Sequence, residues 1–365
     1  MGLGNKLLNS KIRYKIGGLI SKKLKNNSVS IKEIEKLKFK TINYENKEHF
    51  ICEIKDAYVY SSFGFCFDNK KRLIKEAIAF EYALSLKHEI GGKFAFYKLR
   101  KRKTIKYNAF SLQSIWNISF AHWLYETLPR LFILKDTGLS ENIDTIILGD
   151  GCNKKFHNES LDILGFGDKK IVYISDEMEI KCSNLYLSSF PSRGIMRTDK
   201  WICRKYNELA KELYIKNKDK HFPKKVYLQR KNVKTRRLLN ENELINLISK
   251  YGYEVVCPEE NSLEYQFCLA YNADKIISIV GSGLSTVVCS KNTISVLGIE
   301  PYIRPEYDNW TFIVEQVGGK YNYYTEENKD NFKFHNMHNK ANDFDFYIDI
   351  DKFEKQFILF ENDNF

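Results

Sequence analysis

The segment from Val226 to Gly298 constrains the fold of this chain most strongly, because short apolar runs alternate with helical windows along its whole length. A candidate strand is followed by a basic loop, a helix, a second strand, another helix, a third strand and a glycine turn that begins a further helix. This alternation predicts a parallel α/β sheet, and ligands of such sheets bind beyond the carboxyl ends of the strands.

Two features follow strands of this predicted sheet. The strand at 226–228 is followed by a basic cluster: Arg230, Lys231, Lys234, Arg236 and Arg237. The strand at 276–280 is followed by a turn that opens a helix: Gly281, Ser282, Gly283, Leu284 and Ser285. Guanidinium groups and the free N–H groups of a helix start both bind phosphorylated anions. Together they predict an anion site; the alternative is a solvated basic loop beside an ordinary glycine turn.

The chain has 365 residues, more than one hydrophobic core usually serves, so two domains are expected. Its net charge of +12 favours phosphorylated substrates, anionic lipid or nucleic acid as partners. Nucleic acid is not expected, because no nucleic-acid-binding module is recognisable and the Lys and Arg residues are widely spread. The 8 cysteines include no C-x-x-C pair, which predicts a reducing, cytoplasmic compartment and no structural metal site.

Residues 1–27 form a predicted basic amphipathic helix. Apolar residues recur every four positions: Leu8, Ile12, Ile16, Ile20 and Leu24. Such a helix can lie on an anionic membrane, here the inner face of the cell membrane, or it can dock on the core of its own protein. No apolar run approaches the ~18 residues that a membrane span needs.

A second segment in which candidate functional residues are concentrated lies at 116–131. His122 and Glu126 are four residues apart, so on a helix they share one face, and Arg130 continues that face. The functional interpretation is a general base with its orienting partner. The structural alternative is a buried histidine satisfied by the carboxylate, with Arg130 as a surface cation. Pro129 is expected to kink or end this helix.

The remaining patterns divide the chain. Further strands, among them 51–54 and 57–60 around a turn, and a helix before position 190 predict an N-terminal α/β domain at 28–195, followed by a C-terminal domain at 196–340 and a tail helix at 341–365. The charged run from Lys98 to Lys106 predicts a solvated loop. Two D-x-D sequences, at 343–345 and 349–351, have the form of metal motifs but fall in the tail, where structural roles are expected.

These motifs together are similar to glycosyltransferase family 61, a group that includes many capsular and surface polysaccharide biosynthesis proteins. The first family motif is matched by Asn117, His122, Trp123, Glu126, Leu128, Pro129, Arg130 and Leu131. The second is matched by Arg230, Arg237, Asn240 and Glu241. The Gly-Ala-Gly-Leu turn of the family corresponds to Gly281, Ser282, Gly283 and Leu284. The resemblance extends over about residues 107–360.

The chain also departs from the family pattern. The Pro-His pair that usually precedes the glycine turn is replaced by Ile279 and Val280. In the Ser-x-x-Glu-Gln element Tyr265 occupies the Glu position, and Glu264 precedes it by one residue. Glu126 stands where Asp is common, which keeps the charge on a longer side chain.

The resemblance implies a GT-B architecture, in which two Rossmann-like domains face each other across a cleft, and transfer that inverts the anomeric carbon. A glycan or lipid-linked acceptor would bind the N-terminal domain near Asn117, Trp123 and Arg130. A nucleotide-sugar, expected to be a UDP-sugar, would bind the C-terminal domain. The residues expected on that donor side are Arg230, Arg236, Arg237, Glu264 and the turn 281–285.

The acceptor hydroxyl needs a base, and the sequence favours Glu126 with His122 as its partner without separating the two. Cationic side chains and a helix dipole would neutralise the departing phosphate, so no metal or other cofactor is expected. Two other classes remain open: a catalytically inactive anion- or nucleotide-binding protein, which the missing Pro-His pair favours, and a peripheral membrane scaffold, which the net charge favours.

Overall fold

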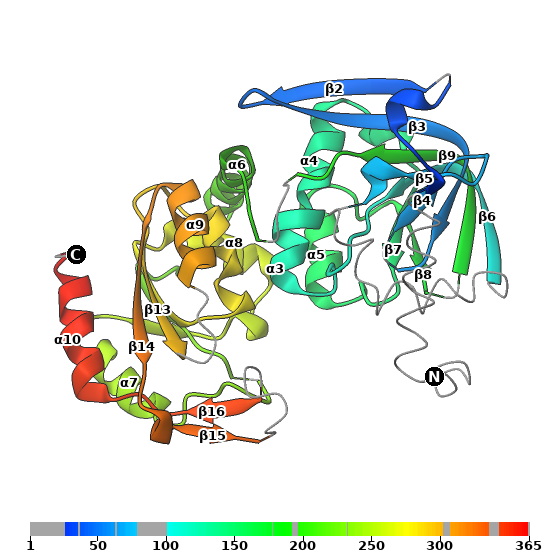
Figure 1. Ribbon diagram of the computed structural model, residues 1–365. Coiled ribbons are helices and arrows are strands. Elements are labelled where there is room, and N and C mark those ends of the chain that lie inside the picture. The colour runs from blue at the N-terminus through cyan, green and yellow to red at the C-terminus, as the bar shows by residue number, and fades with distance from the viewer. Residues whose placement is uncertain are drawn as a thin grey trace. The chain divides into compact units, whose positions relative to one another are not determined.

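The computed structural model of the protein describes residues 26–35, 37–62, 64–78, 101–176, 178–191, 196–231, 233–301, 307–335 and 343–363. The chain forms two compact units, Met1–Ile195 and Met196–Phe365, each described here by itself (Figure 1). The predicted amphipathic helix at 1–27 falls outside the described residues, apart from its last two positions.

The strands of unit 1 are β1 (Ser28–Val29), β2 (Lys38–Tyr44), β3 (Lys47–Tyr60), β4 (Phe65–Phe67), β5 (Leu73–Ile74), β6 (Lys101–Ser111), β7 (Thr145–Gly149), β8 (Lys170–Ile174) and β9 (Met178–Ser188). Its helices are α3 (Phe120–His122), the π-helical turn η6 (Trp123–Thr127), α4 (Pro129–Asp136) and α5 (Lys155–Ile163), with short 3-10 turns η2 (Ile31–Glu33), η3 (Lys75–Ala77) and η7 (Ser140–Asn142).

These strands form one nine-stranded mixed sheet in the order β1-β5-β4-β3-β9-β6-β7-β8, with β2 paired to β3. Strands β6, β7, β8 and β9 are parallel to their neighbours in this set, whereas β3 is antiparallel to β2, β4 and β9. The predicted α/β class is therefore confirmed. Within the described part of unit 1, parallel pairing occurs in the short pair β1–β5 and along β9-β6-β7-β8, and the latter is the run of four strands that a Rossmann-like domain requires.

The long hairpin β2–β3 corrects one expectation from the sequence. Its turn lies at Glu45 and Asn46, which both have positive φ (49° and 64°), as the tight hairpin turns require. The segment 51–60 suggested two strands around a turn, but it is continuous strand with a bulge at Asp56 (φ 52°), which the pairing with β9 skips. The bulge moves the buried positions from even to odd numbers, because Cys52, Ile54, Ala57 and Val59 all enter one core cluster.

The charged run at 98–106 was also wrong as a loop, because its described part from Lys101 onward begins strand β6. Arg102 and Lys103 are exposed while Ile105 is buried. Because the solvent side of this strand carries charged side chains, the alternation of apolar and polar residues that indicates a strand was not visible in the sequence.

The strands of unit 2 are β10 (Lys225–Leu228), β11 (Glu254–Val256), β12 (Lys275–Ile279), β13 (Ser295–Pro301), β14 (Lys320–Glu326), β15 (Phe332–Phe334) and β16 (Phe344–Phe346). Its helices are α6 (Lys200–Lys216), α7 (Glu241–Ser249), α8 (Leu263–Asn272), α9 (Tyr307–Val317), α10 (Ile350–Glu361) and the 3-10 helices η8 (Pro258–Glu260), η9 (Ser282–Cys289) and η10 (Lys329–Asn331).

The main sheet of unit 2 has five parallel strands in the order β11-β10-β12-β13-β14. In chain order this is 2-1-3-4-5, the doubly wound arrangement that the alternation at 226–298 predicts. The strand order reverses between β10 and β12, whose connections lead to opposite sides of the sheet order. This switch point is where such sheets bind ligands.

Helices cover both faces of this sheet (Figure 1). On one face α6, α8, α9 and η9 contact one another. On the other, a core cluster joins Tyr227, Ile277 and Leu297 of the strands to Leu244 of α7 and Phe353 of α10. The predicted tail at 341–365 accordingly supplies β16 and α10 to the packing of unit 2.

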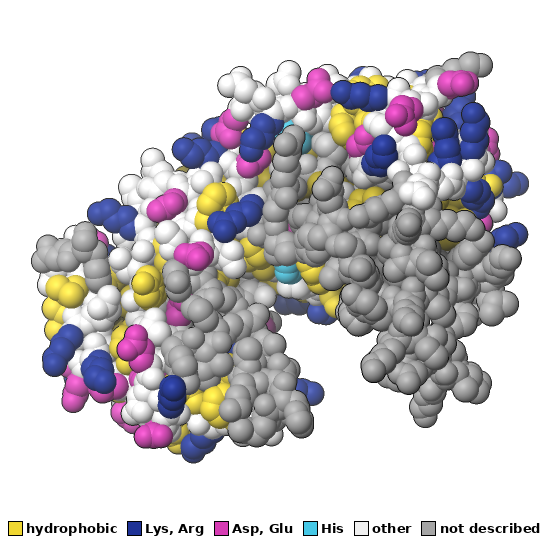
Figure 2. All heavy atoms as spheres, viewed as in Figure 1, with side chains coloured by type: hydrophobic (Ala, Val, Ile, Leu, Met, Phe, Trp, Pro, Cys, Tyr) yellow, Lys and Arg dark blue, Asp and Glu magenta, His cyan; other side chains and the backbone are white. Residues whose placement is uncertain are grey.

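The surface carries charges of both signs. On the face in Figure 2, Lys and Arg side chains of the described residues are interspersed with Asp and Glu. Among the helices that the structure describes, none is long and apolar enough to cross a membrane.

Candidate functional site

The structure joins His122 and Glu126 as the sequence predicts. His122 Nδ1 lies 2.9 Å from Glu126 Oε1, and the side chains are 20% and 2% exposed. Glu126 belongs to the π-helical turn η6, in which the Leu128 N–H donates to Trp123 O, five residues back, at 2.8 Å. Single π turns inside helices occur often at functional sites.

The arrangement assigns different parts to these two side chains. The buried Glu126 carboxylate accepts a hydrogen bond from His122 Nδ1–H, which leaves the lone pair of the neutral ring on Nε2. A carboxylate that orients an imidazole while the other ring nitrogen takes a proton is a common general-base arrangement. The geometry therefore favours His122 as the base and Glu126 as its partner, the reverse of the preference from the sequence.

The loop before α3 is held by a residue that the sequence analysis missed. His157, on α5, is completely buried; its Nδ1 accepts from the Lys154 N–H at 3.2 Å, so Nε2–H donates to Asn117 O at 2.8 Å. Burial lowers the pKa of His157 to about 4, and the hydrogen bond with Asn117 O only partly opposes this. A neutral histidine therefore fixes the backbone five residues before His122. A histidine next to Phe156 at a helix start was the available signal.

Asn117 itself is 3% exposed, and its Nδ2 amide has no hydrogen-bond partner within the described part of the chain. It lies beyond the carboxyl end of β7, since a Cβ built on Gly149 would be 3.6 Å from this Nδ2. A buried amide donor without a partner is costly and suggests a group that meets a ligand or water.

Trp123 and Arg130, predicted on the acceptor side, are both buried within unit 1. Trp123 is fully buried, and its Nε1–H donates to Ser160 Oγ at 2.9 Å. Arg130 is 2% exposed and donates to neutral acceptors only: Ser188 Oγ at 2.7 Å, Gln113 O at 2.8 Å and Ser111 O at 2.6 Å. These contacts tie η6 to α5 and α4 to the sheet, so both residues position the His122 segment.

In unit 2, Arg230 lies at the switch point. It follows β10, and its guanidinium packs against Gly281, which follows the neighbouring strand β12: a Cβ on Gly281 would lie 3.5 Å from Arg230 Cζ. The strands are parallel, with Leu228 opposite Ser278, so their carboxyl ends meet at one edge. The two halves of the predicted anion site are thus adjacent.

The end of β10 is held by Glu241, at the start of α7. One carboxylate oxygen accepts from Tyr227 OH at 2.7 Å and the other from Gln229 Nε2 at 2.9 Å. Burial, and then the charge of Glu241, raise the pKa of Tyr227 well above its ordinary value, so the hydroxyl remains a donor. This network fixes the residue immediately before Arg230.

Arg237 has a different partner. Its Nε donates to Asp345 Oδ2 at 2.9 Å, and its backbone N–H donates to Asp345 Oδ1 at 2.9 Å. Burial opposes ionisation of Asp345, but its hydrogen bonds with Arg237 and His335 hold its pKa below the ordinary value. Arg236 has a positive φ of 58°, and its N–H donates to Phe344 O. The segment 236–237 is thereby joined to β16, and its binding of phosphate remains a prediction.

The aspartates of the D-x-D sequences make hydrogen bonds within unit 2. Asp345 binds Arg237, and Asp349 caps α10 by accepting from the Lys352 N–H at 3.1 Å. Among the described residues, no three His, Cys, Asp or Glu side chains gather closely enough to hold a metal ion.

The remaining predicted donor-side residues differ in how far they are exposed to solvent. The turn opens a 3-10 helix, η9, in which Ser282 is exposed and Gly283 half-buried, whereas Leu284 and Ser285 are fully buried. Glu264, in the first turn of α8, accepts from Asn217 Nδ2 at 2.6 Å. The start of η9 is therefore accessible, and Glu264 binds the end of α6.

Comparison with known proteins places these observations in a family. Residues 120–297 match the family model described as Glycosyltransferase 61. The matched range contains the His122–Glu126 pair, Arg230 and the turn at 281–285, and it is shorter than the 107–360 over which the motifs extend. No curated protein matches the chain. The matched model and the motif residues within it identify residues 120–297 as a glycosyltransferase family 61 domain, so the protein is a glycosyltransferase.

Proposed function

We propose that this glycosyltransferase moves a sugar, with inversion, from a nucleotide-sugar to a glycan or glycolipid acceptor in surface or capsular polysaccharide biosynthesis. The observation that carries the donor part is the contact between Arg230 and Gly281 at the switch point of the parallel sheet. A guanidinium beside an accessible helix start provides the positive charge that a nucleoside diphosphate needs as it departs.

In the proposed reaction, His122 Nε2 removes the proton of the acceptor hydroxyl while Glu126 stabilises the resulting imidazolium through Nδ1–H. The acceptor oxygen attacks the anomeric carbon from the side opposite the diphosphate, the bond to the diphosphate breaks, and Arg230 stabilises the negative charge that develops on it. Inversion follows from this single displacement.

The proposed arrangement is of the GT-B type, with unit 1 supplying the base and unit 2 the donor site. Unit 2 has the doubly wound sheet that this role needs. We further propose a UDP-sugar as the donor, positive charge from protein groups at the diphosphate, and work at the inner membrane face, where the basic segment at 1–27 would contact anionic lipid.

The test is binding of UDP, GDP, CMP and their sugars by calorimetry to the wild type and to Arg230→Ala. One nucleotide class should bind, and Arg230→Ala should weaken it by about 10- to 100-fold, since a charge-assisted hydrogen bond contributes ~1.5–3 kcal/mol. Arg102→Ala is the matched control, because Arg102 is 79% exposed on β6 of unit 1.

Either of two results would contradict the donor assignment: equal affinity in Arg230→Ala, or no binding of any nucleotide. The second would favour an inactive protein instead. The structural reason would then lie at Ile279 and Val280, which replace the Pro-His pair and are buried at 2% and 1% exposure.

A further inference from the structure

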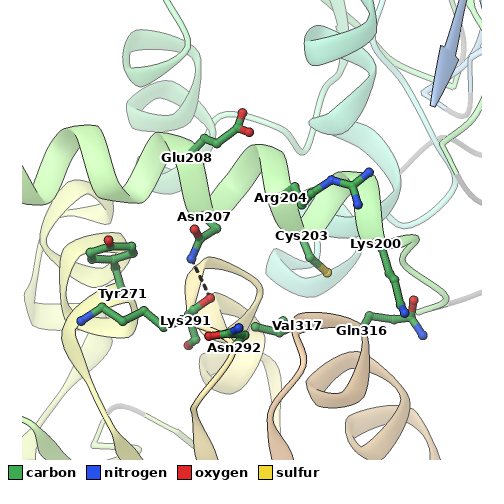
Figure 3. A pocket seen from close by; sticks show the side chains of 11 residues that line it. Lys200, Cys203, Arg204, Asn207, Glu208, Tyr271, Lys291, Asn292, Gln316 and Val317 are labelled. Carbon is green, nitrogen blue, oxygen red and sulfur yellow. Dashed lines mark hydrogen bonds between the residues drawn. The ribbon is translucent and has the colours of Figure 1, made fainter. Parts of the chain in front are cut away.

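Unit 2 contains a pocket that neither the family motifs nor the proposed donor site involve. Its volume is about 450 Å³, which is within the usual range for small-molecule sites. Four elements supply its walls: the first half of α6, Tyr271 near the end of α8, the loop 290–292 after η9, and the end of α9 (Figure 3).

The pocket lies at the opposite edge of the sheet from Arg230. The loop 290–292 leads into the amino end of β13, and Gln316 and Val317 precede the amino end of β14. Arg230 and Gly281 instead follow the carboxyl ends of β10 and β12. A ligand in this pocket would therefore be separate from a nucleotide at the switch point.

The charge of the lining is predominantly positive. Lys200, Arg204 and Lys291 line the pocket, with Glu208 as the only carboxylate among its lining residues. Lys200 extends beside Gln316, and Glu208 points away from the loop that carries Lys291 (Figure 3). Two cationic side chains from separate elements thus flank the pocket without a carboxylate between them.

The surroundings of Lys291 favour the binding of an anion beside its ammonium group. Its Nζ lies 5.0 Å from the Tyr271 ring centre, and burial and the nearby charge of Lys224 both lower its pKa. Asp274 acts in the opposite direction, and it pairs with Lys224 at 3.6 Å. Two neighbouring ammonium groups that share one carboxylate leave positive charge uncompensated at the pocket.

A polar group in the wall also has spare hydrogen-bonding capacity. Ser290 is 1% exposed, and within the described residues its hydroxyl has no hydrogen-bond partner. The backbone around it is fixed, because Asn207 Nδ2 donates to Ser290 O at 2.8 Å (Figure 3). A buried hydroxyl without a partner costs free energy unless a ligand or water meets it.

We propose that this pocket binds a small phosphorylated molecule, with the phosphate at Lys291 and within reach of the Ser290 hydroxyl, and with Lys200 beside Gln316 meeting the other end of the ligand (Figure 3). A phosphate group accepts several charge-assisted hydrogen bonds, and lysine ammonium groups are common donors to it. The volume leaves room for a hydroxyl-bearing body, for which Asn292, Gln316 and Tyr271 offer amide and phenol groups. The proposal is independent of the donor site.

The experiment titrates glucose 6-phosphate, inorganic phosphate and glucose into the wild type, Arg230→Ala and the double variant Lys200→Ala/Lys291→Ala, by calorimetry. Glucose 6-phosphate and inorganic phosphate should both bind the wild type, and the affinity of each should be the same in Arg230→Ala within about twofold. Glucose should not bind either protein. The double variant should bind at least tenfold more weakly, because two charged donors are lost. Lys211→Ala, which removes an exposed charge from α6 outside the pocket, should change nothing.

Ser290→Ala separates binding from folding. It should weaken phosphate binding by about fivefold, the value of one hydrogen bond, while the thermal midpoint without ligand stays equal or rises. The proposal is overturned if neither phosphate binds, if the double variant binds as the wild type does, or if Arg230→Ala alone removes the binding. Binding of inorganic phosphate without glucose 6-phosphate would also contradict it.

Discussion

Arg130 shows how one residue of a functional motif can serve the fold. Its guanidinium is buried without a carboxylate partner, and it donates to two backbone carbonyls and a serine hydroxyl. It also lies 4.6 Å from the centre of the Phe190 ring. Burial lowers its pKa to about 10, which leaves it charged at neutral pH. From the sequence it was expected either on the acceptor side or, in the structural alternative, as a surface cation, because periodicity does not report which way a long side chain turns.

Replacing Arg130 with Met should therefore reduce stability. Leaving buried carbonyls without donors costs ~1–3 kcal/mol each, so the free energy of unfolding should fall by about 3 kcal/mol in urea titrations. Arg102→Met, at an exposed site, should change it by less than about 0.5 kcal/mol. A stable Arg130→Met protein with a raised acceptor KM would instead indicate that Arg130 contacts the acceptor.

The pair His122 and Glu126 supports a prediction that separates base from partner. His122→Ala should lower kcat by about 10²- to 10⁴-fold, the usual contribution of a general base, while donor affinity is unchanged. Glu126→Gln, which keeps an oxygen acceptor for Nδ1–H, should lower kcat by a smaller factor. Steady-state measurement of kcat for both variants tests this assignment. A larger loss of kcat in Glu126→Gln than in His122→Ala would make Glu126 the base.

At the scale of elements, the strand and helix positions at 226–298 in unit 2 followed from the sequence, because most strands there are short apolar runs between turn residues; β14, β15 and β16 were not predicted. Unit 1 was less predictable. The bulge at Asp56 reverses the alternation within β3, and charged residues mask the start of β6. Long-range pairings, such as Arg237 with Asp345 and Asn117 with His157, join positions that no local pattern relates.

The link between α5 and the loop before α3 predicts a pH dependence. His157 has a folded pKa of about 4 against an ordinary 6.5, so the fold favours its neutral form. This stabilisation is complete above about pH 6.5 and is lost as the pH falls towards 4, by about 3 kcal/mol in total. The difference in unfolding free energy between wild type and His157→Gln should shrink over that range. A constant difference would show that His157 does not titrate on unfolding.

For the whole molecule, the proposed base and donor site belong to separate compact units, each with its own core cluster. The sequence predicted two domains from length and pattern alone. The packing inside each unit depends on side chains distributed over many elements, and no single motif contains that information.

This division predicts the behaviour of an isolated unit. Residues 196–365 expressed alone should fold cooperatively, as circular dichroism would show, and should bind the nucleotide with an affinity within about tenfold of the full chain, yet transfer no sugar. Transfer by this fragment would contradict the assignment of the base to unit 1. A folded fragment that binds no nucleotide would contradict the donor assignment instead.

The π turn has a further consequence, because it amounts to one extra residue within a helix. A residue taken up in a π turn sets back everything after it by about 100° relative to a regular helix of the same length. The eight-residue spacing between His122 and Arg130 would place them about 80° apart in a regular helix, and the π turn reduces that angle to about 20°. The turn therefore keeps the histidine aligned with the buried arginine that anchors the helix to the sheet. Replacing the wide turn by a regular helical turn, with no residue removed, would turn one of the two out of place even though every motif residue would still be present.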